Sequence, residues 1–167
     1  LIDLMGGDAK MEAWLDACFN QKTSVEEMPS GDVTGLIGQY AHGNEPSHHM
    51  AWLYNFVGKP WKSQEIVSKI LTTLYSDQAD GLCGNDDAGQ MSAWYIFGSL
   101  GFYPVTPGLP SYVMGAPVFD KAILHLENGK DFVIRTEKTG SANNFVQSTN
   151  LNRKEYLQSF INHRDIV

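Results

Sequence analysis

The stretch 84–100 constrains the fold of this chain more than any other part of the sequence. Two adjacent carboxylates, Asp86 and Asp87, stand directly before a run, 91–100, that contains no charged residue. A helix that is apolar on all its faces belongs in a protein core. Asn85 or Asp86 is a suitable N-cap for such a helix, and acidic side chains favour its positive end. The sequence therefore predicts a capped, buried helix that ends near residue 100.

The cap accounts for only one of the two carboxylates. A second carboxylate at the mouth of so apolar an element is costly unless it has a partner or a chemical role. Gln90 adds a further polar group at the same place. This surplus of polar groups is the first indication of a functional site.

Composition sets broad limits on partners. The 167 residues are 43% hydrophobic and only 19% charged, which provides for a sizeable core. A net charge of −7 argues against nucleic acid and anionic membranes as partners, because their phosphates require basic surfaces. It is compatible with a neutral substrate or a bound cation. Cys18 and Cys83 form neither a disulfide framework nor a zinc motif.

The chain begins at Leu1 without an initiator Met, a signal peptide or an apolar transmembrane run. We therefore expect it to be a piece of a longer protein.

Helical patterns dominate the part before residue 104. Apolar spacing predicts amphipathic helices over 8–19 and 44–57, and a third helix capped by Ser63 that runs to about Leu74. Residues 20–43 lack such periodicity and read as a long loop, a feature that is often functional in a compact domain.

After Tyr103 the pattern changes, because four prolines between 104 and 117 break any helix. Two alternating apolar runs, 121–126 and 131–135, flank Asn128-Gly129, a strong hairpin signal. Further short strands are expected at 144–147 and 154–157, with a turn at 150–152. The fold class predicted is mainly α with a β-rich C-terminal tail, divided near residue 104.

A second dense polar cluster lies at 40–49 and contains His42, His48, His49 and Glu45. No two of these histidines are four apart on a helix, so the zinc-binding pattern His-Glu-x-x-His is not present. Histidines that orient loops or hold hydroxyl groups fit better. Asn44, Glu45 and nearby carbonyls offer the oxygen ligands that a hard cation prefers.

Both clusters fall at loop-to-helix junctions, at 44–46 and 85–87. In a layered helical domain two such junctions can face one cavity, and carboxylates gathered there suit acid–base hydrolysis of a glycosidic bond. The alternative that both clusters merely cap helices stays open on spacing alone.

Several long motifs in order give a specific resemblance. They are Gly38-Gln39-Tyr40-Ala41-His42-Gly43-Asn44-Glu45-Pro46-Ser47-His48-His49, Gly58-Lys59-Pro60-Trp61, Gly84-Asn85-Asp86-Asp87, Gly89-Gln90-Met91-Ser92-Ala93-Trp94-Tyr95, Gly101-Phe102-Tyr103-Pro104-Val105, Pro107-Gly108 and Tyr112-Val113-Met114-Gly115. Together they resemble glycoside hydrolase family 92. Members of that family are calcium-dependent, exo-acting α-mannosidases that invert the anomeric configuration.

The resemblance also implies an architecture, an N-terminal β-sandwich followed by an (α/α)6 barrel. Residues 1–104 would be the last helices of that barrel and residues 105–167 a β-rich C-terminal subdomain. The rest of the barrel and the β-sandwich would lie outside this chain, and the substrate would be a mannose-containing glycan. An extracellular or periplasmic location follows for the full-length protein.

The resemblance assigns the catalytic roles to the 85–87 junction. Asp87 matches the general base that activates water, and the helix N-terminus is expected to keep it ionised. Asp86 would assist it or cap the helix, because Asn85 stands where relatives often have an acidic residue. The family's general acid is a Glu expected upstream of Leu1, so the isolated chain is expected to be inactive.

The remaining implied roles concern ligands. Asn44 and Glu45 lie in the motif that resembles the calcium site, through side chains or carbonyls. The residues implied to line the mannose pocket, or to support those that do, are Gln39, His42, His48, His49 and Gln90. A non-catalytic carbohydrate-binding or interaction module, with at most structural calcium, is the alternative to an enzyme.

Overall fold

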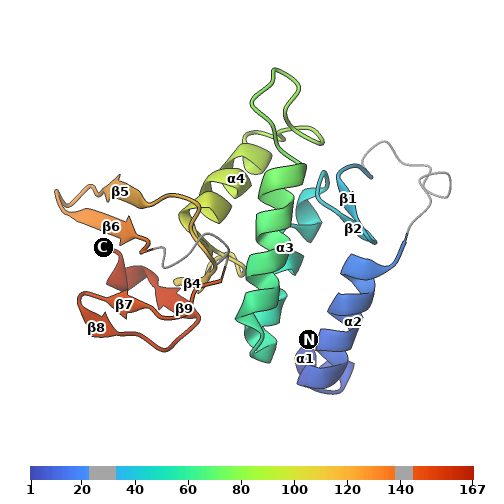
Figure 1. The fold of residues 1–167 in the computed structure, drawn as a ribbon, viewed down its shortest axis with the longest axis horizontal. Helices are drawn as coiled ribbons and strands as arrows, with labels where there is room; N and C mark the ends of the chain where they lie inside the picture. Colours follow the sequence, from blue (N-terminus) through green and yellow to red (C-terminus); the bar gives the residue numbers. More distant parts are fainter. Residues whose placement is uncertain (23–32, 138–144) are drawn as a thin grey trace.

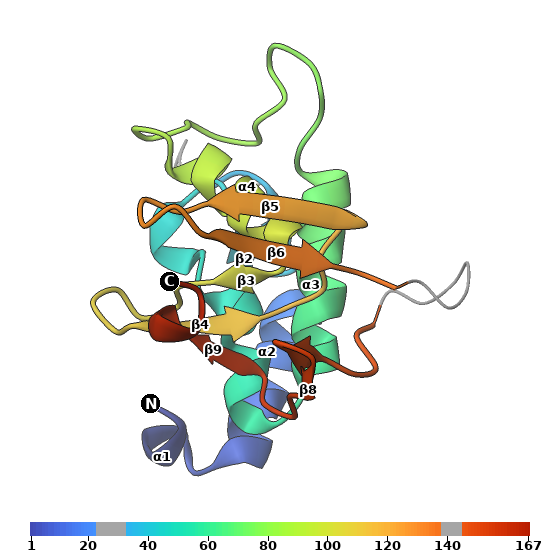
Figure 2. The same ribbon diagram turned by 90° about the vertical axis from the view of Figure 1, so that its left-hand side faces the viewer.

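The structure, a computed structural model, describes residues 1–22, 33–137 and 145–167. The helices form one side of the molecule and the strands of the C-terminal part the other (Figure 1). Figure 2 shows the strand side face-on. Residues 23–32 of the predicted loop at 20–43 and residue 144 of the predicted strand at 144–147 lie outside the described residues. The described part of the loop contains two short strands, at 36–37 and 40–41, and residues 145–147 form no strand, so both predictions are wrong there.

Helices in the first part surround a common core. In chain order they are α1 (Ile2–Met5), α2 (Asp8–Asn20), η2 (Glu45–Ser47), η3 (Met50–Val57), α3 (Pro60–Thr73) and α4 (Gln90–Leu100), where η denotes a 3₁₀ helix. The 3₁₀ helix η3 packs against both α2 and α3. Met11, Leu15 and Phe19 of α2 are buried, as the amphipathic pattern of that helix predicts.

The predicted helix at 44–57 is present as two 3₁₀ segments, η2 and η3. With three residues per turn, Ala51, Tyr54 and Val57 fall on one buried face, joined by Trp52. Met50 and Leu53 are only partly buried, although both pack against the same core. Gly58 ends the segment in the left-handed conformation (φ 70°), as its position suggested.

Helix α3 begins earlier than predicted. Its first residue is Pro60, whose fixed φ and missing N–H suit the first helical position. Ser63, predicted to be the cap, lies inside the helix and is fully buried.

Helix α4 is central but not buried on every side. Trp94 is fully buried and Met91 lies beside it in the interior, whereas Ile96 is 57% exposed. Its N-cap is Gly89, not Asn85 or Asp86, although Asp86 still contacts the first turn. The absence of charge thus predicted the helix but not its exposed face.

The strands form small antiparallel sheets. They are β1 (Leu36–Ile37) with β2 (Tyr40–Ala41); β3 (Phe102–Tyr103), β4 (Ser111–Met114) and β9 (Phe160–Asn162) in the order β3-β4-β9; β5 (Lys121–His125) with β6 (Asp131–Arg135); and β7 (Asn150–Leu151) with β8 (Lys154–Glu155). A last 3₁₀ turn, η4 (His163–Asp165), follows β9. The hairpin β5–β6 pairs Ile123 with Val133 around a turn in which Gly129 has φ 79°, as predicted.

The β3-β4-β9 sheet shares the core of the helices. Tyr103 and Val113 belong to the same buried cluster as Trp52 and Trp94, and the Trp52 and Tyr103 rings stack with centroids 5.4 Å apart. The predicted division near residue 104 stays a prediction. No helix within the described part of the chain is long and apolar enough to cross a membrane.

Candidate active site

A polar hollow of about 510 Å³ opens where two loop-to-helix junctions meet. It is lined by Thr34, Gly43, Asn44, Glu45, Gly84, Asn85 and Asp87. One junction precedes η2 and the other precedes α4. The structure thus brings the two polar clusters of the sequence to one cavity.

Close backbone approach joins the two junctions at the floor of this hollow. A Cβ built on Gly84 would lie 2.9 Å from the Cα of Gly43, and one on Gly43 would collide with the Oγ1 of Thr34. Only glycine permits this approach. The Thr34 Oγ1 is buried and finds no hydrogen-bond partner among the described residues. A ligand oxygen or cation in the hollow would supply one.

The segment that carries Asp87 has an unusual backbone. Asp87, Ala88 and Gly89 have φ of 45°, 57° and 93°, three left-handed residues in succession. Side-chain-bearing residues in this region cost about 1–2 kcal/mol each relative to right-handed backbone. Such strain is concentrated at functional sites, where surrounding contacts hold it in place.

Asp86 is not part of the hollow's lining and contacts the start of α4. Its Oδ1 accepts the backbone N–H of Ser92 at 2.9 Å, and its carbonyl accepts the N–H of Met91. Asp86 therefore satisfies first-turn donors of α4, as one carboxylate of the pair was expected to do.

Asp87 instead contacts Glu45 across the hollow. A hydrogen bond with the Glu45 carboxyl, a little desolvation and the charges of Glu45 and Asp86 raise the pKa of Asp87. The sequence suggested that the helix N-terminus would keep Asp87 ionised. The structure adds a stronger opposing effect, because two carboxylates that face each other cannot both ionise freely.

The donor set of the hollow fits a hard cation. It offers two carboxylates, from Glu45 and Asp87, with the Thr34 hydroxyl and the Asn44 amide beside them, and all these oxygens suit calcium better than a soft metal. Across the ranges 1–22, 33–137 and 145–167, no three His, Cys, Asp or Glu side chains gather as a metal cage. A cation in the hollow would be coordinated by these two carboxylates and by neutral oxygens.

His42, next to the lining residue Gly43 in the chain, is fully buried. Its Nδ1 is 2.7 Å from the Tyr40 hydroxyl and its Nε2 is 2.5 Å from the Tyr75 hydroxyl. Burial and then the neighbouring His48 ring lower the pKa of His42 to about 3. His42 is therefore a neutral ring held on both sides by the protein.

His48 is also buried and joins the two junctions. Its Nε2 contacts the His42 carbonyl at 2.9 Å, and its Nδ1 lies 3.2 Å from the Nε2 of Gln90, the first residue of α4. Burial lowers the pKa of His48. Trp94 donates its indole N–H to the His48 carbonyl at 3.0 Å.

None of the five predicted pocket residues, Gln39, His42, His48, His49 and Gln90, belongs to the lining of the hollow. Gln39 is exposed at the β1–β2 turn, where its backbone N–H donates to the Cys18 carbonyl. His49 is half-buried at the N-cap of η3. Neither residue is brought to Asp87.

Sequence reasoning missed Thr34 and Tyr75. Thr34 stands in the aperiodic stretch before β1, and Tyr75 follows the last turn of α3, so neither belonged to a motif with chemical meaning. The Gly43 and Gly84 positions flanking the polar clusters were the available signal for the close approach.

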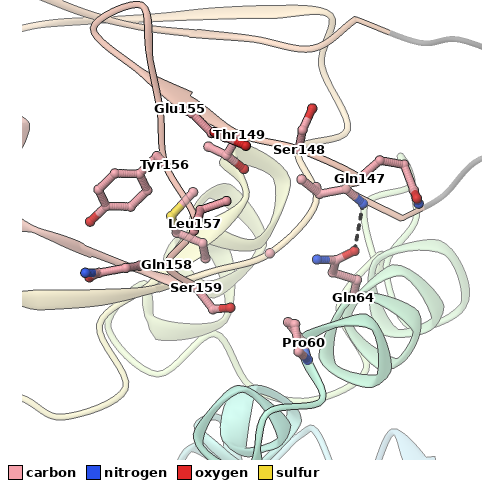
Figure 3. Close-up of a pocket in the computed structure, with 13 residues that line it drawn as sticks. Pro60, Gln64, Gln147, Ser148, Thr149, Glu155, Tyr156, Leu157, Gln158 and Ser159 are labelled. Carbon is pink, nitrogen blue, oxygen red and sulfur yellow. Dashed lines mark hydrogen bonds between the residues drawn. The ribbon is translucent and has the colours of Figure 1, made fainter.

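A second hollow, of about 210 Å³, lies between the start of α3 and the C-terminal segments (Figure 3). Gln64 accepts the backbone N–H of Val146 at 2.9 Å along its wall. None of the residues predicted to be functional lines it.

Comparison with known proteins decides the family. A model of the glycosyl hydrolase family 92 catalytic domain matches residues 1–167. The chain belongs to glycosyl hydrolase family 92.

Solved structures of family 92 enzymes are similar to it. One is a family 92 α-mannosidase from Bacteroides thetaiotaomicron in complex with mannoimidazole, 38% identical, with a TM-score of 0.90 over 96% of this chain and 21% of that one. Another, the family 92 inverting mannosidase from Bacteroides thetaiotaomicron VPI-5482, is 36% identical, with a TM-score of 0.81 over 98% of this chain and 23% of that one.

A protein of Arthroderma benhamiae, described as an uncharacterized secreted glycosidase, is 30% identical over 98% of this chain and 19% of its own length. The family 92 chain thus spans about a fifth of the length of these relatives.

Proposed function

We propose that this chain forms part of the catalytic region of a calcium-dependent exo-α-mannosidase that hydrolyses terminal α-mannosides with inversion. Family 92 membership and the similarity to α-mannosidases over nearly the whole chain support this proposal. The single observation that carries it is the meeting of Glu45 and Asp87 in one polar hollow. A protein that used these clusters only as helix caps would have no reason to oppose two carboxylates.

The proposed architecture assigns residues 1–104 to an (α/α)6 barrel and residues 105–167 to a β-rich subdomain. The rest of the barrel and an N-terminal β-sandwich would come from the longer protein. The isolated chain would then be inactive, because the general acid, a Glu, lies outside it. The secreted relative supports an extracellular or periplasmic location.

Asp87 is proposed to be the general base. It would accept a proton from water as the water oxygen bonds to the anomeric carbon, while the bond to the leaving oxygen breaks and that oxygen takes the proton of the general acid. Asp86 holds the base in place by fixing the backbone that enters α4.

Calcium would be held by Glu45 with the Asn44 amide and neighbouring oxygens. When bound, it would grip the vicinal 2- and 3-hydroxyls of mannose and favour ring distortion. A cation beside Glu45 also favours the ionised form of the carboxyls around it, which would reverse the raised pKa of Asp87. The base and the cation site would thus depend on each other.

The remaining site residues are proposed to shape the mannose pocket, some at its surface and others from the protein interior. Gln90 stands half-buried beside the strained segment, and His42 and His48 support it and the junctions from the interior. Gln39 and His49 would approach the glycan only with the missing parts of the barrel in place.

A second candidate function is a non-catalytic carbohydrate-binding module. It is favoured by the lining of the hollow, where the only carboxyl groups among the described residues are those of Glu45 and Asp87, which suit a cation, and no further carboxyl is present to act as a general acid. The two functions differ in whether a bond in the glycan is broken.

The experiment is release of mannose by the full-length protein from terminal α-mannosides, with β-mannosides as the matched control. We expect release from the α-linked substrates only, its loss on chelation and its return with calcium. Binding of the glycan without release of mannose would show that the protein is a carbohydrate-binding module and not an enzyme. Release that persists after complete chelation would overturn the calcium assignment.

A further inference from the structure

Buried side chains tie the loop of Glu45 to the loop of Asp87. Neither loop is regular: residues 42–49 form turns and a short 3₁₀ segment, and 84–89 contain the left-handed residues. The relative placement of the two carboxylates therefore depends on contacts between the loops.

Tyr40, His42, Tyr75 and the Met91 carbonyl form a hydrogen-bond network, and its acceptors determine where the protons lie. A backbone carbonyl can only accept, so the Tyr75 hydroxyl donates to the Met91 carbonyl at 3.1 Å. The Tyr75 oxygen then accepts from the Nε2–H of His42, and the His42 Nδ1 accepts from the Tyr40 hydroxyl. A neutral imidazole has one N–H and one acceptor, and His42 uses both.

His48 is fixed in the same way. Its Nε2–H donates to the His42 carbonyl, so its Nδ1 accepts from the Gln90 amide. The Gln90 amide nitrogen also lies 3.5 Å from the Tyr103 hydroxyl, which orients the same amide.

Tyr75 occupies the central place in this network. Its hydroxyl contacts both the ring of His42, three residues before Glu45, and the backbone of Met91, four residues after Asp87. A β-bridge to Leu82 anchors its backbone, and its ring is parallel to Trp94 with centroids 6.3 Å apart. The hydroxyl is thereby held at a fixed point between the two loops.

We propose that Tyr75 is a positioning residue whose hydroxyl sets the placement of Glu45 relative to Asp87. It acts through His42 on one loop and through the first turn of α4 on the other. This role rests on the proposed function of the two carboxylates, whereas the tie between the loops stands on the hydrogen bonds alone. Removing the hydroxyl leaves the His42 N–H and the Met91 carbonyl without their buried partner.

The test compares Tyr75→Phe with Tyr95→Phe in the full-length protein. Tyr95 is the matched control, because its ring contacts that of Tyr75 (centroids 4.8 Å apart) and its hydroxyl takes no part in the network. Hydrogen exchange over 84–92, calcium affinity by titration calorimetry, and kcat and KM on an α-mannoside are measured where both variants are folded.

For Tyr75→Phe we expect exchange over 84–92 to be faster by about tenfold, calcium affinity to be weaker by about tenfold, and kcat to fall more than KM rises. Tyr95→Phe should match the unaltered protein in all three. Lower thermal stability of Tyr75→Phe with unchanged exchange, calcium affinity and kcat would reduce Tyr75 to a packing role and overturn the inference. If the unaltered protein binds no calcium, the proposed function fails, and the exchange comparison still decides whether Tyr75 ties the loops.

Discussion

The carboxyl groups of Glu45 and Asp87 line the same polar hollow, and Glu45 raises the pKa of Asp87, although the two residues belong to loops at the starts of different helices. Two neighbouring carboxylates repel each other, and a proton on one of them or a cation between them relieves that repulsion. Their proximity links the acid–base chemistry proposed for Asp87 to the calcium site proposed for Glu45.

Replacing Glu45 by Gln should therefore weaken calcium binding. The variant removes one of the two carboxylates in the hollow, and the calcium affinity of oxygen sites depends on the number of charged ligands. We expect affinity to fall by at least about tenfold in titration calorimetry of the full-length protein. Glu65→Gln, on the exposed side of α3, is the control and should bind as before. Restoration of the chelated enzyme by zinc but not by calcium would show that the site has been misidentified.

The left-handed backbone at Ala88 predicts that a glycine substitution there stabilises the protein, whereas glycine inside a helix destabilises it. Ala88→Gly should raise stability by about 1 kcal/mol, because glycine adopts φ 57° without the strain of a Cβ. Ala93→Gly, in the middle of α4, should lower it by about 1 kcal/mol. Denaturant unfolding of the two variants checks the pair. A destabilising Ala88→Gly would mean that the segment is not strained in this way.

Elements specified by local chemistry could be predicted from the sequence. The β5–β6 hairpin follows from Asn128-Gly129 between alternating runs, and α2 from its amphipathic spacing. The polar junctions were predicted to share a cavity because both begin helices, and they do share one.

Elements that depend on partners distant in the sequence could not be predicted from it. The strands β3, β4 and β9 are two to four residues long and exist because they pair with one another across the chain. The choice of 3₁₀ over α geometry in η3 depends on what Trp52 and Tyr54 pack against. Tyr40, His42 and His48 of this network lie in one sequence motif, but Tyr75 has no sequence signature of its own, because only folding brings it to His42 and Met91.

The aromatic core provides a direct test of packing. Trp94 is fully buried, contacts other rings and donates to the His48 carbonyl, so Trp94→Ala should cost about 3–5 kcal/mol. Trp61 is 47% exposed and its ring lies beneath the Lys59 ammonium, so Trp61→Ala should cost less than about 1 kcal/mol. Equal shifts of the two unfolding midpoints would contradict this description of the core.

The buried His42 predicts a loss of stability in acid. In the unfolded chain His takes a proton near pH 6.5, whereas the pKa of folded His42 is lowered to about 3. Between these values the unfolded state binds more protons, so stability falls as pH falls, by at most about 1.4 kcal/mol per pH unit from this residue. His48, whose pKa is lowered by burial, acts in the same direction.

Unfolding midpoints between pH 7 and pH 4.5 measure this effect. His42→Gln should be less stable at pH 7 and lose less on acidification. An unchanged slope in His42→Gln would show that the ring is protonated in the folded protein.

The most direct test of the central claim is the turnover of Asp87→Asn in the full-length enzyme. Asn preserves the shape of the side chain and removes its basicity, so kcat on an α-mannoside should fall by about 10²–10⁴ with substrate binding largely kept. Asp86→Asn, the neighbouring control that acts on the cap of α4, should retain far more activity. Proton NMR of the early product of the unaltered enzyme should show β-mannose. Near-normal turnover of Asp87→Asn, or α-mannose as the first product, would contradict the assignment of Asp87 as the base of an inverting mannosidase.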